Sequence, residues 1–578
     1  MNTRPIKANP SQIIVEQLAA SGVKYVFNNS GSHEARFFDA LHEHPDVHNI
    51  LALHEGAVAG MAGGYTQVQN DPAVMVVHLG AGLAQSLGQM ANIWNARLPV
   101  VVITYAADSG SGTDRAGWGH HLSHNVGPTS ISAPFVKASW AVIKPDGIAH
   151  AMYRALLVAK TPPVGAVHVA FYEGTLGPEE VEGNIIEGGL PELRAGYPAD
   201  SDVEEIARIL TQAKRPILHI GDGIWKSGAE SQLKALAERL GIPITTGGNQ
   251  WMRSVPPNHK LHCEDINALE PDYVICAGIR NMGGFDQFSN AEGIIAIGPD
   301  VENFKNLEGL GMAVLADERR TLERLEECLD VTEGDTDRFS DRRTWALEQA
   351  ATQQAKRREA MQSVEPQAAK VRPWVLADTL DKELARIGGG LVLMEQFALM
   401  QCIGGIQPDG NNVYLQPAGG SEGYGVGGAI GVKLAAPDKP VVGLVGDGSV
   451  YYSDSGFWTA ARHRIPVLYI IPNNESYGVV ARSFGAAGGF MKQTGEYAGV
   501  VLDGIDPVKI AEGFGVDGMH VQDEARLAQA ISHGLDVVEG EGRPFVLNVH
   551  LPRGLPEGGR AAVPFHLADA VAVQARAA

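Results

Sequence analysis

Short runs of β-branched and other apolar residues alternate along this chain with Ala- and Leu-rich amphipathic stretches. The run VMVVHLGAG at 74–82 precedes a helical pattern that reaches Trp94, and PVVVIT follows at 99–104. The same alternation returns in PILHIGDG at 216–223 and in PVVGLVGDG at 440–448. Strands that alternate with helices of this length form parallel sheets covered by helices. The pattern therefore predicts an α/β protein with doubly wound parallel sheets.

Two polar segments divide this pattern into three parts. The segment around 176–202 is rich in Gly, Pro and acidic residues, and the segment around 331–372 is highly charged. A chain of 578 residues also exceeds the usual size of one domain. We expect three domains and a short C-terminal arm, at 1–185, 200–335, 370–560 and 561–578.

Composition and charge narrow the classes of function. Hydrophobic residues make up 44% and charged residues 20%, which is typical of a folded globular protein. The net charge of −21 disfavours binding to nucleic acid or to an anionic membrane. The four cysteines form no CxxC pair, and no apolar run is long enough to span a bilayer. We expect a cytoplasmic protein that acts on a small molecule, with neither nucleic acid nor membrane as a partner.

The most informative stretch is VVGLVGDGSVYYSDSGFWTAARHRIPVLYIIPNNESYG at 441–478. An apolar strand runs into Gly446-Asp447-Gly448, and after one helical crossover a second strand ends at Asn473-Asn474. Either group alone would be explained by a tight turn. Together they fall at the carboxyl ends of neighbouring strands, where doubly wound sheets bind ligands. Carboxylate and amide oxygens suit magnesium, and glycines let backbone N–H groups approach a diphosphate.

A GDG group followed by an Asn pair at this interval resembles the cofactor motif of the thiamine-diphosphate-dependent enzymes. By that resemblance, thiamine diphosphate and Mg²⁺ are the cofactors, and Asp447, Asn474 and the main-chain carbonyl of Ser476 bind the metal. The resemblance also implies that the diphosphate is held by the GDG turn and the residue after it, that is by Gly446, Asp447, Gly448 and Ser449.

The first domain supplies a matching glutamate in NILALHEGAVAGMAGGYTQV at 49–68. In this stretch we expect a strand that ends at Glu55, followed by a helix of small residues. Taken alone, such an acid would be explained by the dipole of the helix. The family places a glutamate here, so the resemblance assigns Glu55 to the aminopyrimidine ring and to activation of the cofactor. In this family the two halves of the site come from different subunits, which implies a homodimer or homotetramer.

The resemblance covers nearly the whole chain and is closest to benzoylformate decarboxylase and similar acetolactate synthase-like 2-oxo acid decarboxylases. It assigns Ser32, in SGSHE, to the substrate carboxylate and His78 to proton transfer, although a histidine at a strand end can also be a hydrogen-bonded core residue. His120 and His121, in WGHHLSHN, resemble the paired histidines of pyruvate decarboxylase-type enzymes, and a catalytic role for them stays open.

Two departures from the family pattern bear on the chemistry. The stretch AGIRNMGGFDQFSN at 277–290 lacks the second active-site histidine that benzoylformate decarboxylase has in its middle domain. In PAGGSEGYGVGGAIG at 417–431, Glu422 stands where relatives place a bulky apolar residue beneath the cofactor. A buried carboxylate without a partner is costly. Glu422 therefore reflects either a one-residue shift of the alignment or a part in the chemistry of this enzyme.

Two functions remain in view from the sequence. The leading hypothesis is non-oxidative decarboxylation of a 2-oxo acid with an aromatic or bulky side chain, which yields an aldehyde. The alternative is a carboligase or lyase that forms or cleaves a C–C bond next to a carbonyl, like acetolactate synthase or 2-hydroxyacyl-CoA lyase. The central domain shows no G-x-G-x-x-G fingerprint, so we expect no flavin.

Overall fold

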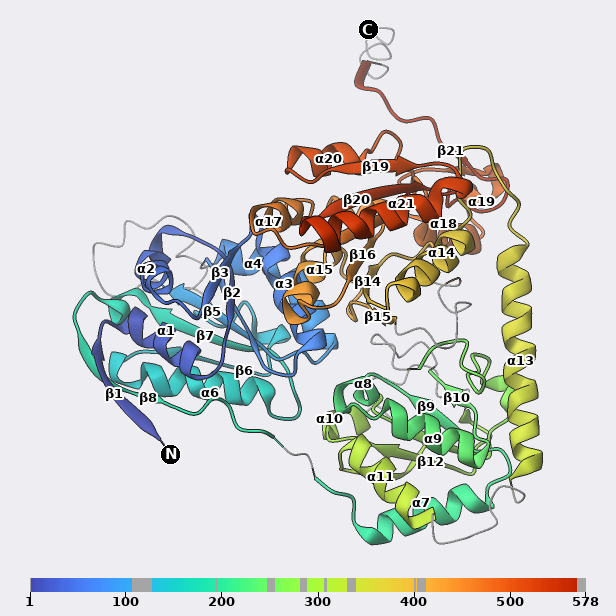
Figure 1. Ribbon diagram of the computed structural model, residues 1–578, viewed down its shortest axis with the longest axis horizontal. Helices are drawn as coiled ribbons and strands as arrows, with labels where there is room; N and C mark the ends of the chain where they lie inside the picture. The colour runs from blue at the N-terminus through green and yellow to red at the C-terminus, as the bar shows by residue number, and fades with distance from the viewer. Residues whose placement is uncertain are drawn as a thin grey trace.

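The computed structural model describes residues 2–78, 80–106, 127–193, 196–246, 255–280, 288–305, 309–329, 339–399, 402 and 412–568. Three lobes are visible, each built on its own parallel sheet (Figure 1). The prediction of an α/β fold with three doubly wound sheets is confirmed. We keep the domain limits given above as proposals.

The first sheet has the strand order β3-β2-β4-β5-β7-β6, with every neighbouring pair parallel. Its apolar side chains alternate between two cores, as period-2 strands covered on both faces require. Helices α3 and α4 lie on one face, and α1, α2 and α6 lie on the other. The strands are β2 (Tyr25–Asn29), β3 (His48–Leu51), β4 (Ala73–Val77), β5 (Val100–Ala106), β6 (Ala138–Val142) and β7 (Val167–Tyr172). The helices are α1 (Pro10–Ala20), α2 (Ala35–Glu43), α3 (Glu55–Val68), α4 (Ala81–Asn95) and α6 (Ile148–Lys160).

A two-stranded antiparallel sheet closes this lobe, because β1 (Thr3–Ala8) pairs with β8 (Val181–Ile186). The chain then enters the central lobe, whose parallel sheet has the order β10-β9-β11-β12-β13. Its strands are β9 (Ile217–Ile220), β10 (Ile244–Thr245), β11 (Tyr273–Ala277), β12 (Gly293–Ile297) and β13 (Leu310–Val314). Its helices are α7 (Asp200–Gln212), α8 (Gly223–Ser227), α9 (Glu230–Leu240), α10 (Val301–Phe304) and α11 (Glu318–Leu329). The long helix α13 (Ser340–Gln362) leads to the third lobe (Figure 1).

The third sheet has the order β15-β14-β16-β17-β20-β19, again with parallel neighbours. Helices α15, α17 and α20 pack on one face, and α14 and α21 pack on the other. The strands are β14 (Leu391–Glu395), β15 (Val413–Leu415), β16 (Val441–Val445), β17 (Leu468–Asn473), β19 (Gly518–Val521) and β20 (Phe545–His550). The helices are α14 (Pro373–Arg386), α15 (Gly425–Ala435), α16 (Asp447–Val450), α17 (Gly456–Arg462), α18 (Gly478–Ala486), α19 (Phe490–Thr494), α20 (Pro507–Gly513) and α21 (Glu524–Asp536).

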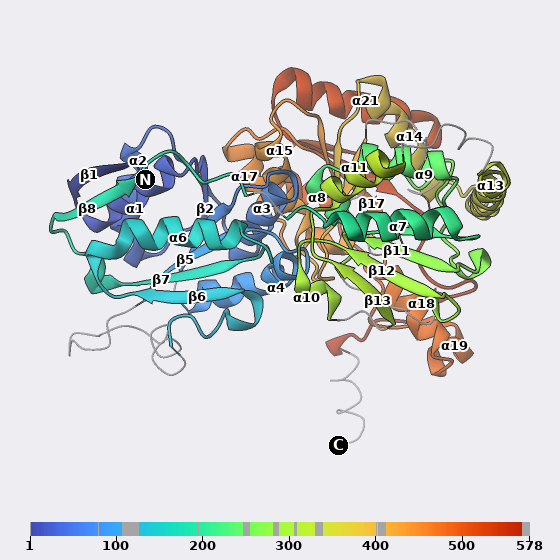
Figure 2. The ribbon, with the colours of Figure 1, turned by 90° about the horizontal axis from the view of Figure 1, so that it is seen from below.

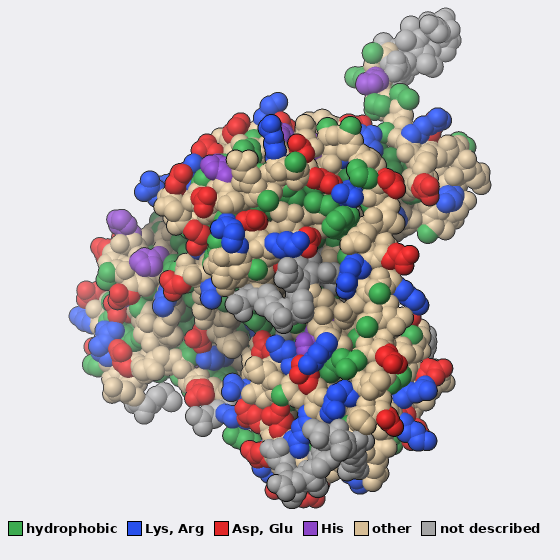
Figure 3. Space-filling view, turned by 45° about the vertical axis from the view of Figure 1, so that its right-hand side comes forward, with side chains coloured by type: hydrophobic (Ala, Val, Ile, Leu, Met, Phe, Trp, Pro, Cys, Tyr) green, Lys and Arg blue, Asp and Glu red, His purple; other side chains and the backbone are tan. Residues whose placement is uncertain are grey.

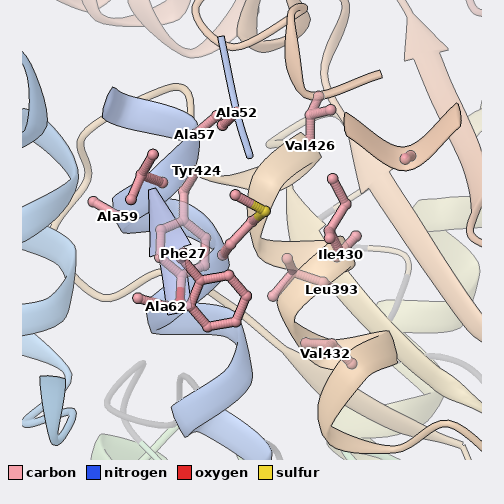
Figure 4. Packing of buried hydrophobic residues seen from close by; sticks show 14 of the residues in the cluster. Phe27, Ala52, Ala57, Ala59, Ala62, Leu393, Tyr424, Val426, Ile430 and Val432 are labelled. Carbon is pink, nitrogen blue, oxygen red and sulfur yellow. The ribbon is translucent and has the colours of Figure 1, made fainter. Parts of the chain in front are cut away.

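The first and third lobes share a core that passes between them. Helices α3 and α4 lie between the first sheet and the rest of the molecule (Figure 2). Small side chains of α3 such as Ala57 and Ala62 face Tyr424 and Ile430, which belong to α15 and the residue before it (Figure 4). The backbones approach so closely that a Cβ on Gly64 would lie 2.0 Å from the carbonyl oxygen of Gly428. Small residues on both helices therefore fix how the two lobes meet.

The C-terminal segment leaves the body of the molecule after β21 (Arg560–Ala561), which pairs with β18 (Glu496–Tyr497). Figure 3 shows this segment standing away from the surface with hydrophobic side chains on it. Val563, Phe565 and Leu567 are each more than 70% exposed. On the same view acidic and basic side chains are interspersed over the body. No helix in the described ranges is both long and apolar enough to cross a membrane.

Candidate active site

The carboxyl edge of the third sheet brings the two predicted polar groups together. From β14 the chain continues to β15 on one side and later returns to β16 on the other, so the crevice between β14 and β16 is the topological switch point. Gly446 follows β16 at this crevice and precedes α16, while Asn473 ends the neighbouring strand β17.

Asp447 is the centre of this arrangement. It is the first residue of α16 and is 4% exposed. The N–H of Gly448 donates to Asp447 Oδ1 at 3.0 Å, and the backbone N–H groups of Glu475 and Ser476 lie near the carboxylate. Burial raises the pKa of Asp447 to about 6, and these N–H groups act against that rise. The residues after the Asn pair thus lie beside the carboxylate of the GDG turn.

The oxygens at this point suit a magnesium ion. Asp447 Oδ2 is buried and has no hydrogen-bond partner among the described residues. Within the described part of the chain, Asn474 Oδ1 accepts a single long bond of 3.3 Å, from the N–H of Ser476. A free carboxylate oxygen beside an amide oxygen is a hard donor set of the kind that Mg²⁺ prefers. Over the described part of the chain, no group of three or more His, Cys, Asp or Glu side chains is arranged to hold a metal.

A cavity of about 420 Å³ opens over these residues, and we call it the carboxyl-edge cavity. The GDG turn, α18 and the segment 551–554 all contribute to its lining. Gly448 has to lack a side chain, because a Cβ there would lie 2.5 Å from the ring of Tyr477. Among the described residues, none before Val364 lines this cavity.

Glu422 also lines the carboxyl-edge cavity. The hydroxyl of Ser449 donates a short hydrogen bond to Glu422 Oε2. Burial raises the pKa of Glu422, while the bond from Ser449 lowers it. The Glu422 carboxylate therefore has a hydrogen-bond partner on α16, so it is not an unpaired buried carboxylate.

Glu395, at the end of β14, belongs to the same site and was missed in the sequence. It is buried and accepts the N–H groups of Tyr424 at 2.8 Å and Gly425 at 2.6 Å. Burial first, and the charge of Glu422 second, raise the pKa of Glu395 to about 8. The signal was available in LVLMEQ, an apolar strand that ends in a polar pair like the strand before GDG.

A second group of polar side chains lies at the carboxyl edge of the first sheet, at its switch point between β2 and β4. We call Ser32, His33, Glu34, Glu55 and His78 the His78 cluster. The first three form a 3₁₀ turn, η1 (Ser32–Glu34), after β2, and His78 follows β4. Ser32 is exposed. The structure thus brings the predicted Ser32 and His78 to the same edge.

His78 is held by a residue that the sequence did not single out. Its Nδ1 lies 2.9 and 3.2 Å from the two carboxylate oxygens of Glu34, which is fully buried. The ring of His33 stacks on it with 5.5 Å between centroids. The hydrogen bond to Glu34 raises the pKa of His78, and burial opposes that rise. A proton on Nδ1 is thereby fixed toward Glu34, and Nε2 is left for exchange.

Glu55 is the first residue of α3 and is 7% exposed, so it lies four residues beyond the end of β3 rather than at the strand end that we expected. Gly82 leaves room for it, since a Cβ there would lie 2.7 Å from Glu55 Oε1. Glu55 and His78 contribute nothing to the carboxyl-edge cavity of their own chain. His120 and His121 lie outside the described residues.

Comparison with known proteins relates this geometry to one family. Three family models match the chain, described as thiamine pyrophosphate enzyme N-terminal TPP binding domain (residues 9–125), central domain (203–325) and C-terminal TPP binding domain (400–549). The chain is 26% identical to benzoylformate decarboxylase of Pseudomonas aeruginosa, over 92% of this chain and 97% of the relative. It is 23% identical to the acetolactate synthase isozyme 3 large subunit of Escherichia coli, over 93% and 94%.

A solved structure has the same fold. The thiamine diphosphate-dependent 4-hydroxybenzoylformate decarboxylase of Rhodococcus jostii RHA1 superposes with a TM-score of 0.77 at 23% identity, over 94% of this chain and 99% of that one.

Proposed function

The chain belongs to the family of thiamine pyrophosphate enzymes, and on that premise we propose that it binds thiamine diphosphate with Mg²⁺ and decarboxylates a 2-oxo acid to an aldehyde without oxidation. The observation that carries this proposal is the buried, unpartnered Oδ2 of Asp447 at the switch point of the third sheet. Such an oxygen is stable only when a cation or donor meets it.

The proposed ligands of the metal are Asp447, Asn474 and the carbonyl of Ser476. Around them, Gly446, Gly448 and Ser449 would receive the diphosphate, where backbone N–H groups and a lack of side chains allow close approach. When bound, the cofactor supplies the electron sink for the carbon that loses CO₂.

The walls of the carboxyl-edge cavity favour a bulky apolar substrate side chain. Phe397, Val479 and Val480 line the cavity, and each is more than a third exposed. Apolar side chains that face a cavity gain free energy when a ligand covers them, by about 25 cal/mol for each Å² removed from water. An aromatic or branched 2-oxo acid therefore fits better than pyruvate.

Proton transfer and cofactor activation belong to the His78 cluster in this proposal. His78, with Nδ1 held by Glu34, would exchange a proton with the substrate oxygen through Nε2, and Ser32 would hold the substrate carboxylate. Glu55 would hydrogen-bond the aminopyrimidine ring. Because no described residue of the same chain's first domain lines the carboxyl-edge cavity, we propose that these residues act in the cavity of a second subunit. The assembly would be a homodimer or homotetramer. We also propose that the protein is cytoplasmic.

A C–C bond-forming or bond-cleaving reaction without net decarboxylation is the second candidate. The specific observation in its favour is the segment 277–290, which has no histidine where a decarboxylase of the benzoylformate type has one. In that case the enzyme would release an acyloin or acyl-CoA product in place of free aldehyde.

The deciding experiment is consumption of benzoylformate, pyruvate and a branched-chain 2-oxo acid by the purified enzyme, with and without thiamine diphosphate and Mg²⁺. We expect cofactor-dependent loss of a bulky acid and appearance of its aldehyde. If no acid is consumed although the cofactor binds in calorimetry, decarboxylation is excluded and the second candidate takes its place.

A further inference from the structure

Glu422 is a titratable side chain of the carboxyl-edge cavity whose function the preceding proposal leaves open. Glu422 lines the cavity and bonds to Ser449. Ser449 stands two residues after Asp447, the proposed metal ligand. A second candidate for proton transfer in the cavity is Tyr477. A hydrogen bond with Tyr452 and burial raise the pKa of Tyr477 to about 12. Its hydroxyl is therefore a much weaker proton donor than a carboxyl group, which favours Glu422.

The backbone around Glu422 is held on one side by the first lobe. Gln89, on α4, donates from Nε2 to the carbonyl of Glu422 at 2.6 Å. Asn92, one turn further along, donates from Nδ2 to the carbonyl of Ser421 at 2.8 Å and accepts the N–H of Gly419 at 2.8 Å. The carbonyl direction of Glu422 is therefore fixed by side chains of another lobe.

The other side of the segment is held by Glu395, which accepts the N–H groups of Tyr424 and Gly425. Gly423, between Glu422 and Tyr424, has φ of +99°, a conformation that glycine adopts readily. A Cβ there would lie 2.7 Å from Cβ of Tyr452. With the backbone anchored on both sides, the Glu422 side chain lies in the cavity and meets the hydroxyl of Ser449. Such preorganisation is what a catalytic side chain requires.

The surroundings of Glu422 favour a neutral carboxyl group with a proton to give. Burial raises the pKa of Glu422, and the charge of Glu422 in turn raises the pKa of the neighbouring Glu395, so that an ionised Glu422 is disfavoured by its removal from water. Among the described residues, no lysine or arginine forms an ion pair with Glu422. The chain also has no histidine in 277–290 to act as a second proton donor.

We propose that Glu422 is the catalytic acid that delivers a proton to the substrate carbon from which CO₂ departs; this rests on the proposed function. The C–C bond to the carboxylate breaks and leaves its electron pair on that carbon. A C–H bond then forms with the proton of Glu422, whose O–H bond breaks to leave a carboxylate. When the aldehyde forms, the hydroxyl proton on the same carbon returns to Glu422. The net proton consumed comes from solvent through His78, which protonates the substrate oxygen.

The test compares Glu422→Gln, which has the same size but no acid, with Glu422→Asp, which keeps a carboxyl. Glu512→Gln, an exposed change on α20, is the matched control. Affinity for thiamine diphosphate with Mg²⁺ is measured by calorimetry on each apoprotein. CO₂ and aldehyde are then followed separately in a single turnover of the 2-oxo acid that the wild-type enzyme consumes.

We expect Glu422→Gln to bind the cofactor within about twofold of wild type and to release CO₂ in the first turnover, while aldehyde formation slows by roughly 100-fold or more, the range of general acid catalysis. Glu422→Asp should recover part of the aldehyde rate, and Glu512→Gln should match wild type. If Glu422→Gln does not fold, Glu422→Asp must still slow aldehyde formation relative to CO₂ release.

Three outcomes overturn the proposal, and they are distinguishable. Aldehyde formation at the wild-type rate in Glu422→Gln rules out the role of Glu422 but leaves the proposed function standing. An equal slowing of CO₂ release and aldehyde, or a large loss of cofactor affinity, makes Glu422 a binding residue. A wild-type enzyme that releases no CO₂ from any acid removes the proposed function and this role with it.

Discussion

At the scale of single residues, buried carboxylates set the state of the groups around them. Glu34 is fully buried and bonds to His78, and Glu395 is buried and accepts bonds from two backbone N–H groups. The first carboxylate favours a protonated histidine, whereas the second is itself driven toward the neutral acid. The difference follows from the partner, because a titratable imidazole can supply positive charge and an amide N–H cannot.

Replacing Glu34 by Gln should lower the pKa of His78, because the hydrogen bond to the carboxylate is the largest cause of its rise. The pKa of His78 in the folded protein lies above the ordinary value of 6.5. The stability that the Glu34–His78 bond contributes is therefore complete below about pH 6.5 and is lost as the pH rises through the folded pKa. The variant should therefore lose more stability at pH 6 than at pH 9. NMR titration of the labelled imidazole and urea unfolding at the two pH values measure these effects.

The matched control for this change is Glu43→Gln, an exposed substitution at the end of α2. It should leave the His78 titration where it is. A His78 pKa that does not move in Glu34→Gln would contradict the role that we assign to the buried carboxylate.

At the scale of elements, the contact between α3 and α15 depends on glycine. A Cβ on Gly64 would lie 2.0 Å from the carbonyl oxygen of Gly428, and one on Gly431 would lie 2.0 Å from that of Met61. Both obstacles are backbone atoms, which cannot rotate away as a side chain can. The two helices therefore have to separate if either glycine gains a methyl group.

Gly64→Ala should destabilise the protein by about 1–3 kcal/mol or more, the usual cost of overpacking a core. Gly513→Ala, at the end of α20, is the control, since nothing lies within 4 Å of a Cβ there and alanine favours the helix. Thermal unfolding of both variants measures the difference. Equal melting temperatures would show that the two lobes do not meet as closely as α3 and α15 indicate.

At the scale of the whole molecule, the first and third lobes have the same topology. In each sheet the second strand of the chain lies at one edge, followed by the first, third, fourth, sixth and fifth. In each, polar side chains lie at or after the ends of the first and third strands: Glu34 and His78 in one lobe, Glu395 and Asp447 in the other. Identical strand orders put a switch point in both lobes, so the chain carries two candidate ligand edges.

If an active site combines the His78 cluster of one subunit with the carboxyl-edge cavity of another, two inactive variants should complement each other. Glu55→Gln and Asp447→Asn would each abolish activity alone. After unfolding and refolding as an equal mixture, half of the dimers would be mixed, each with one intact site, which gives about a quarter of wild-type activity. Turnover of the mixture measures this, and no recovery would place both halves of a site in one chain.

Much of this architecture was readable from the chain. The alternation of strands and helices predicted three parallel sheets, and the positions of GDG and the Asn pair after two consecutive strands predicted that these two groups lie at the carboxyl ends of neighbouring strands. Both inferences use local information: hydrophobic period, turn chemistry, and the rule that parallel strands end at a common edge.

The pairings that define the two polar groups came only from the tertiary structure. Glu34 meets His78 across 44 residues, Glu422 meets Ser449 across 27, and Gln89 reaches Glu422 across 333. No local pattern encodes these distances, because they depend on the strand order within each sheet and on how α3 packs against α15. The sequence by itself therefore determined the sheets and the carboxyl edges, since those follow from neighbours along the chain. The structure decided which acid holds which partner, since that follows from neighbours in space.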